Sequence, residues 1–158
     1  MMIARALQTL FGLNAHVMSV NLEGITHEDS LIRPNEGGHC INWILGHVIA
    51  NRNPILHTVG GDPIWTDEEA LFYQRGSQPF DNASAAHSLT KLITDFTRSQ
   101  QQLQGALQSI DEERLATAST PDGSSPGEIL VTLAFHESYH AGQIGLLRRI
   151  LGKPGAIR

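Results

Sequence analysis

The chain has 158 residues, of which 41% are hydrophobic and 17% are charged, a composition typical of a folded globular protein. This length predicts one domain over residues 1–158 with a core of its own. The net charge is −5, with only 11 Lys and Arg residues spread along the chain, so we expect no nucleic-acid partner.

The first predicted element is a helix over about residues 3–22. Its apolar residues recur at steps of three and four, the spacing that lines one face of a helix: Ile3, Leu7, Leu10, Leu13, Val17 and Val20. Polar residues break this run, so the segment does not resemble a signal peptide, and no segment approaches the ~20 apolar residues of a membrane span. The lone cysteine, Cys40, agrees with a reducing compartment. We therefore expect a cytoplasmic protein without a membrane partner.

A second helix is predicted over about residues 38–58, with a bend near Pro54. One face of this helix carries Cys40, Ile44, His47, Asn51 and Ile55. His47 lies in the middle of the face and follows Gly46, whose missing side chain allows a neighbouring helix to approach closely. Taken alone, a histidine in this position is more often a core residue than a metal ligand.

The next segments complete a helical pattern. Residues 60–82 mix Gly, Pro and Asp with scattered aromatics, which predicts a long crossover with one short helical turn. A third helix is predicted over residues 83–110, where the apolar stripe consists of Leu89, Ile93, Phe96, Leu103, Leu107 and Ile110. With a fourth helix after it, this order is typical of an all-α four-helix bundle with one long crossover connection.

The fourth helix is predicted from residue 126 to about residue 151. Ser125 can cap it, Pro126 can occupy its first position, and Glu128 can complete a capping box. Its predicted inward stripe includes two histidines among Ile129, Leu133, His136, His140, Ile144, Leu147 and Leu151.

His136 and His140 are the strongest chemical signal in the sequence. A spacing of i, i+4 places both rings on one face of a helix, so one cation can take a nitrogen from each. Without a metal, two neutral histidines in an apolar layer would leave several nitrogens without hydrogen-bond partners, which is costly. The pair predicts a divalent-metal site, with hydrogen-bonded core histidines as the alternative.

Residues 136–140, HESYH, also fit the H-E-x-x-H pattern of zinc peptidases, in which Glu137 would be the general base. Those enzymes take their third ligand downstream, yet no His, Asp, Glu or Cys follows His140. We therefore do not favour a peptidase.

The third ligand must then lie upstream, where His47 is the preferred candidate because it occupies the middle of an apolar helix face. His16 lies beside the stripe of the first helix and stays open as a ligand or supporting residue. Solvated or capping roles in loops and near helix ends are expected for the others: His27, His39, His57 and His87.

The segments NWILGH, which ends at His47, and HESYHAGQIGLLRR, which begins at His136, resemble the DinB-like (YfiT-like) family of metalloenzymes. The resemblance implies a four-helix bundle in which one histidine of the second helix and a His-x-x-x-His pair of the fourth hold a divalent metal. These positions correspond here to His47, His136 and His140. Characterised relatives include transferases and an isomerase that use low-molecular-weight thiols such as bacillithiol, mycothiol or glutathione. The resemblance thus implies a small-molecule substrate of this kind.

Residues near the ligands could support the chemistry. Gln143 lies one turn from His140 and could hold a ligand or a metal-bound water, and Asn51 has the same relation to His47. Glu137 lies roughly 100° round the helix from His136, so it is a candidate base, with a solvated or ion-paired side chain as the alternative. We name Glu137 and Gln143 as candidate catalytic residues.

The ligand pattern indicates a metal site, and the resemblance implies thiol chemistry, so we consider two hypotheses. Three neutral imidazoles leave the full charge and an open position on the ion, the pattern of a catalytic site. The first hypothesis is a metal-dependent enzyme, a thiol S-transferase or, less favoured, a hydrolase. The second is a metal-binding bundle without turnover in a stress response. Zinc is expected first because a His-rich site suits it, although nickel, iron, manganese and copper fit the same ligands.

We also expect a homodimer. The crossover carries Trp65, Phe72 and Tyr73, which one small domain is expected to leave partly exposed, and bundles of the related family often pair.

Overall fold

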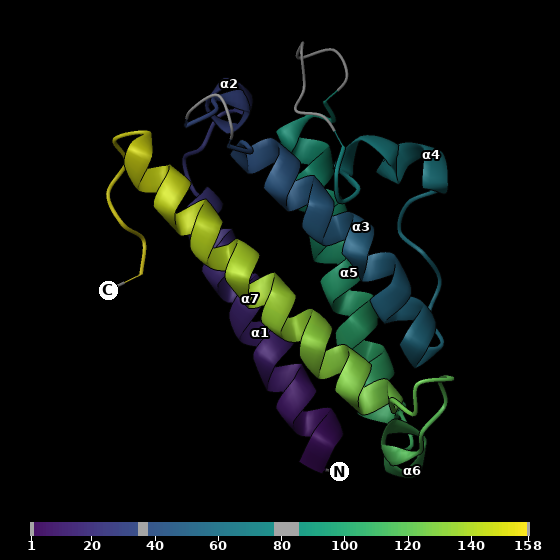
Figure 1. The fold of residues 1–158 in the computed structure, drawn as a ribbon. Helices are drawn as coiled ribbons and strands as arrows, with labels where there is room; N and C mark the ends of the chain where they lie inside the picture. The colour runs from purple at the N-terminus through teal and green to yellow at the C-terminus, as the bar shows by residue number, and fades with distance from the viewer. Residues whose placement is uncertain (1, 35–37, 78–85, 158) are drawn as a thin grey trace.

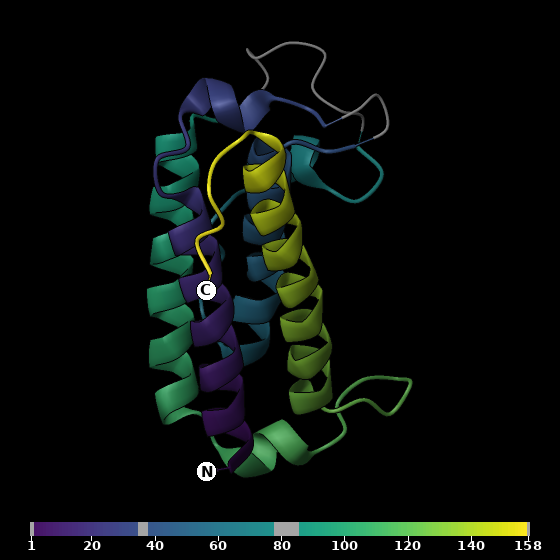
Figure 2. The same ribbon diagram turned by 90° about the vertical axis from the view of Figure 1, so that its left-hand side faces the viewer.

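The computed structural model describes residues 2–34, 38–77 and 86–157. Its four long helices are α1 (Met2–Leu22), α3 (Ile41–Val59), α5 (Leu89–Ser109) and α7 (Pro126–Ile150). Helix α1 packs against α7 and α3 packs against α5, and further contacts join α3 to α7 and α1 to α5 (Figures 1 and 2). None of the described residues is in a strand, so the predicted all-α class is confirmed.

Short helices occupy the connections. They are α2 (His27–Leu31), α4 (Asp67–Ala70), the 3-10 helix η1 (Leu71–Tyr73) and α6 (Glu112–Ala116). Helix α2 lies at one end of the long helices and α6 at the other (Figure 1). The predicted short turn in the crossover corresponds to α4 and η1, whereas α2 and α6 were not predicted. Each of these two begins at a side-chain cap, Thr26 for α2 and Asp111 for α6.

The predicted helix starts agree with the structure to different extents. Helix α7 begins as predicted, because the Ser125 side chain accepts from the backbone N–H of Glu128 and Pro126 is its first residue. Helix α5 begins later than predicted, with Ser88 as its N-cap. Residues 86–88 are not helical, and the predicted positions 83–85 lie outside the described residues.

The face of α1 that enters the core agrees with the predicted one only in part. Leu7 is buried as predicted, but Leu10 and Leu13 are 40% and 56% exposed, whereas Phe11, Asn14 and Met18 are buried. Asn14 is stable there because its amide donates to a backbone carbonyl of α7 and accepts from a serine hydroxyl of the same helix. The predicted apolar stripe did not include this asparagine, so the predicted face is rotated from the one that the structure buries.

An ion pair lies where the four long helices meet. Arg52 of α3 is fully buried, and its Nε and Nη2 each donate to the carboxylate of Glu137 on α7 at 2.7 Å. The guanidinium carbon lies 5.2 Å from the ring centroids of both Phe11 on α1 and Phe96 on α5. This one pair therefore contacts residues of all four long helices.

The aromatic residues of the crossover are mostly covered. Trp65 and Tyr73 are 2% and 0% exposed, and only Phe72 remains half exposed. The expectation that this chain alone would leave all three exposed is therefore wrong for two of them. Among the described helices, none combines the length and the apolar character that crossing a membrane requires.

Candidate metal centre

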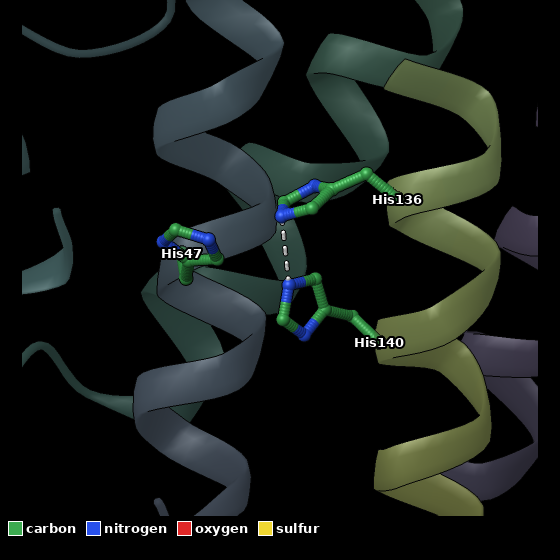
Figure 3. A group of neighbouring side chains, drawn as sticks. All are labelled: His47, His136 and His140. Atoms are coloured by element: carbon green, nitrogen blue, oxygen red, sulfur yellow. Dashed lines mark hydrogen bonds between the residues drawn. The ribbon is translucent and has the colours of Figure 1, made fainter. Parts of the chain in front are cut away.

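Three histidines converge between α3 and α7. His47 projects from α3, and His136 and His140 project from α7 into the space between the two helices (Figure 3). One ring nitrogen from each lies within 4.8 Å of the other two. The ring centroid of His47 lies 5.3 Å from that of His136 and 5.0 Å from that of His140. The structure thus brings together the three residues that the sequence singled out.

The two histidines of α7 point their Nε2 atoms at each other, 3.1 Å apart (Figure 3). His140 Nδ1 lies 2.7 Å from Oε1 of Gln143, which can only accept, so Nδ1 carries the proton and Nε2 offers its lone pair. Without a metal, His136 Nε2–H then donates to His140 Nε2. Two ligands of one ion at 2.0–2.1 Å bond lengths stand about 3 Å apart, so a cation can fit between these atoms with little movement of the rings when His136 carries its proton on Nδ1.

The ring of His47 is oriented by the crossover. Its Nδ1 lies 2.7 Å from the backbone carbonyl of Tyr73, which again fixes the proton on Nδ1 and leaves Nε2 free to bind a metal. Asn51 Nδ2 lies 3.2 Å from that Nε2 and donates to the backbone carbonyl of His47 at 2.8 Å. A metal at this site would therefore displace one contact of the Asn51 amide.

Gly46 makes this arrangement possible, although not in the way the sequence suggested. A Cβ at this position would overlap the ring of Tyr73, so the missing side chain accommodates the crossover rather than a neighbouring long helix. The close packing holds the Tyr73 carbonyl against His47.

The electrostatics keep all three imidazoles neutral near pH 7. Burial lowers the pKa of His47, of His136 and of His140, and that of His140 falls to about 4. The positive charge of Arg75 further lowers the pKa of His136. Neutral imidazoles are the form that binds metals, so the site does not have to lose protons before it takes up an ion.

Glu137 and Gln143, the candidate catalytic residues, occupy different places. Glu137 is 2% exposed and its carboxylate pairs with Arg52, so it faces the centre of the four helices. This contact agrees with the predicted alternative in which the Glu137 side chain is ion-paired. Gln143 holds the ring of His140, as described above, and its Nε2 donates to the Tyr139 hydroxyl at 3.3 Å.

Two further neighbours surround His47. The Trp43 ring stacks on the His47 ring, with centroids 4.7 Å apart. The His39 ring in turn stacks on Trp43, with centroids 3.6 Å apart. A solvated or capping role was predicted for His39, and Tyr73 was not predicted to contact the site. The spacing of Trp43 and His47 along one helix could have indicated the first stack, but a backbone carbonyl from a crossover leaves no signal in the sequence.

The comparisons with known proteins agree with this fold. The sequence profile of the DinB superfamily matches residues 12–144, a range that includes all three histidines. A solved structure, that of the conserved protein of a locus from Enterococcus faecalis, is similar with a TM-score of 0.73 at 15% identity, over 94% of this chain and 97% of that one. At this identity the likeness concerns the fold alone. No curated protein is significantly similar to the chain.

Proposed function

The chain belongs to the DinB superfamily, and from this premise and the geometry of the three histidines we propose that it is a metal-dependent enzyme that transfers a low-molecular-weight thiol. His47, His136 and His140 would hold one divalent ion, with zinc as the first candidate. The observation that carries the proposal is the convergence of three neutral imidazoles, each of which has one ring nitrogen within 4.8 Å of a ring nitrogen of the other two.

A divalent ion held by three neutral ligands keeps an open position and lowers the pKa of a thiol placed there, which is the chemistry that the proposal requires. The protein contributes the orientation of the ligands. The Tyr73 carbonyl holds His47 and the Gln143 side chain holds His140, each through Nδ1. Gln143 is therefore a positioning residue in this proposal.

Base catalysis by Glu137 is not part of the proposal. Its carboxylate accepts two hydrogen bonds from Arg52 in the core, and this pair connects the two helices that carry the ligands. Its contribution would be to fix α3 against α7 and so to set the distance from His47 to the histidine pair.

A thiol-transfer assay on tag-free protein tests the proposal. Zinc-loaded protein is mixed with cysteine, glutathione or 2-mercaptoethanol and the electrophile monobromobimane, and S-alkylation is followed by fluorescence. We expect faster alkylation of at least one thiol by zinc-loaded protein than by metal-free protein, and no acceleration by His136→Ala, which circular dichroism should show to be folded. Zinc binding without acceleration of any thiol would favour a binding protein without turnover, or the hydrolase alternative if an ester substrate is cleaved.

A further inference from the structure

The turn that follows η1 is fixed on α3 beside the histidines. The Trp43 indole N–H lies 3.0 Å from the Phe72 carbonyl and 2.9 Å from the Ser77 hydroxyl. The Ser77 hydroxyl itself donates to the Phe72 carbonyl at 2.8 Å, which closes the turn. Together with the bond from His47 to the Tyr73 carbonyl, these contacts hold both ends of the turn to the helix that supplies a candidate metal ligand.

Arg75 lies within this turn. It comes two residues after Tyr73 and just before Gly76, whose φ of 83° needs a glycine and reverses the chain. Its side chain is exposed. The turn that carries Arg75 is bonded to α3 at Trp43 and at His47, so this cation belongs to a segment that contacts one of the three histidines. Its positive charge acts in the same direction as burial, which lowers the pKa of His136 on α7.

Arg75 differs from the arginines that stabilise the fold. Arg52 donates to Glu137, Arg98 donates to the Ile64 carbonyl, and Arg148 donates to carbonyls at the C-terminal end of α1. Within residues 2–34, 38–77 and 86–157, Arg75 has neither a hydrogen-bond acceptor nor an ion-pair partner. No contact within these residues therefore assigns Arg75 a role in the stability of the fold.

We propose that Arg75 binds a carboxylate of the small molecule whose thiol occupies the open position of the metal centre. A guanidinium donates two parallel hydrogen bonds to a carboxylate, a geometry that fixes the orientation as well as the position of the ligand. The inference rests on the proposed function and deepens it, because it restricts the substrate class to small thiols that carry a carboxylate. Arg75 would then select the thiol and orient it, while the histidines would position its sulfur through the ion.

Binding calorimetry on the zinc-loaded protein tests this assignment without an activity assay. The probes are 3-mercaptopropionate and its neutral isostere 3-mercaptopropanamide, which differ only in the carboxylate. We expect the protein to bind 3-mercaptopropionate about tenfold more tightly, the size of one charge-assisted hydrogen-bonded contact. Arg75→Gln should remove this preference, and Arg75→Lys should keep part of it. Zinc stoichiometry is measured first on every variant.

The control is Arg5→Gln, which removes an exposed arginine from α1 and should leave the preference unchanged. If the wild-type protein binds both probes equally, or if Arg75→Gln retains the preference with zinc bound, the assignment of Arg75 is overturned and the metal centre stands. If the wild-type protein binds no zinc, the proposed function fails, and the assignment of Arg75 fails with it.

Discussion

His140 is the ligand candidate whose ionisation the fold changes most. Burial lowers its pKa to about 4, the charges of His136 and His47 act in the same direction, and the bond to Gln143 opposes them. An unfolded chain has no such environment, and a histidine there titrates near pH 6.5. The difference connects the site to the stability of the metal-free protein.

We predict that the metal-free protein loses stability as the pH falls from about 6.5 towards 4. Over this range the unfolded chain binds a proton at His140 that the folded chain excludes, so protonation favours unfolding, by roughly 2 kcal/mol at pH 5. Urea unfolding at pH 7 and pH 5 measures this loss. The loss of stability between the two pH values should be smaller in His140→Gln by about the contribution of His140. His16→Gln, which removes an exposed histidine, is the control and should lose as much as the wild type. Equal losses in the wild type and in His140→Gln would contradict the prediction.

Gln143 gives a second test at the scale of one residue. Replacing it by Leu removes the acceptor that holds His140 Nδ1, so we expect zinc affinity to fall about tenfold or more. Gln143→Glu keeps an acceptor and should retain most of the affinity. Competition with a chromophoric chelator measures the affinity, and Gln101→Leu, an exposed position on α5, is the control. Unchanged affinity in Gln143→Leu would show that the contact does not orient the ligand.

At the scale of the elements, the pair of Arg52 and Glu137 connects α3 to α7. We predict that Arg52→Met destabilises the protein by about 3–5 kcal/mol, because it leaves the Glu137 carboxylate buried without its partner. The double variant Arg52→Met, Glu137→Leu should regain most of this loss, since two apolar side chains can fill the same volume. Urea unfolding of the two single variants and the double variant completes the cycle. Additive losses would show that the two side chains do not act as a pair.

The same pair shows why the positions of the helices in the sequence were predicted better than the faces that each helix buries. Hydrophobic periodicity located all four long helices, because each carries a long apolar stripe. The predicted apolar stripes left out Asn14 and Glu137, since a pattern cannot show that a polar side chain will find a partner on another helix. In α7 the buried face is centred on Glu137, so His136 lies at its half-buried edge. An edge position agrees with a site that small molecules must reach.

The candidate metal centre was predictable to a similar extent. The spacing of His136 and His140 follows from helical geometry, His47 was the upstream histidine in the middle of an apolar helix face, and the family resemblance agreed with all three. The residues that orient and surround these ligands could not be predicted in this way. Tyr73 acts through its backbone carbonyl, and the proposed role of Arg75 depends on the turn after η1; both residues come from a crossover whose path no periodicity describes. Such contacts depend on the tertiary fold alone.

At the scale of the whole molecule, one surface is unusually apolar. The outer face of α7 carries Val131, Phe135, Tyr139, Leu146 and Ile150, all more than half exposed. Helix α1, which packs beside α7, also exposes Leu10 and Leu13. The outer face of α7, rather than the crossover aromatics, now supports the expectation of a homodimer, because large exposed apolar patches mark contact surfaces.

We predict that Phe135→Asp yields a monomer at micromolar concentration while the wild type sediments as a dimer. Phe135 is 73% exposed in the single chain, so the aspartate disturbs no internal packing and should leave the helical circular dichroism unchanged. Phe72→Asp changes the exposed aromatic residue of the crossover and should not dissociate the dimer. A monomeric wild-type protein in sedimentation velocity would contradict the prediction.

The central claim is that one divalent ion binds to His47, His136 and His140 together. Anomalous diffraction at the zinc edge, with metal analysis of protein purified without a histidine tag and incubated with zinc, tests it most directly. We predict one ion per chain with three imidazole nitrogens about 2.0–2.1 Å away. A site that stays empty under these conditions, an ion bound elsewhere, or a His47 ring turned away from the ion would contradict the claim.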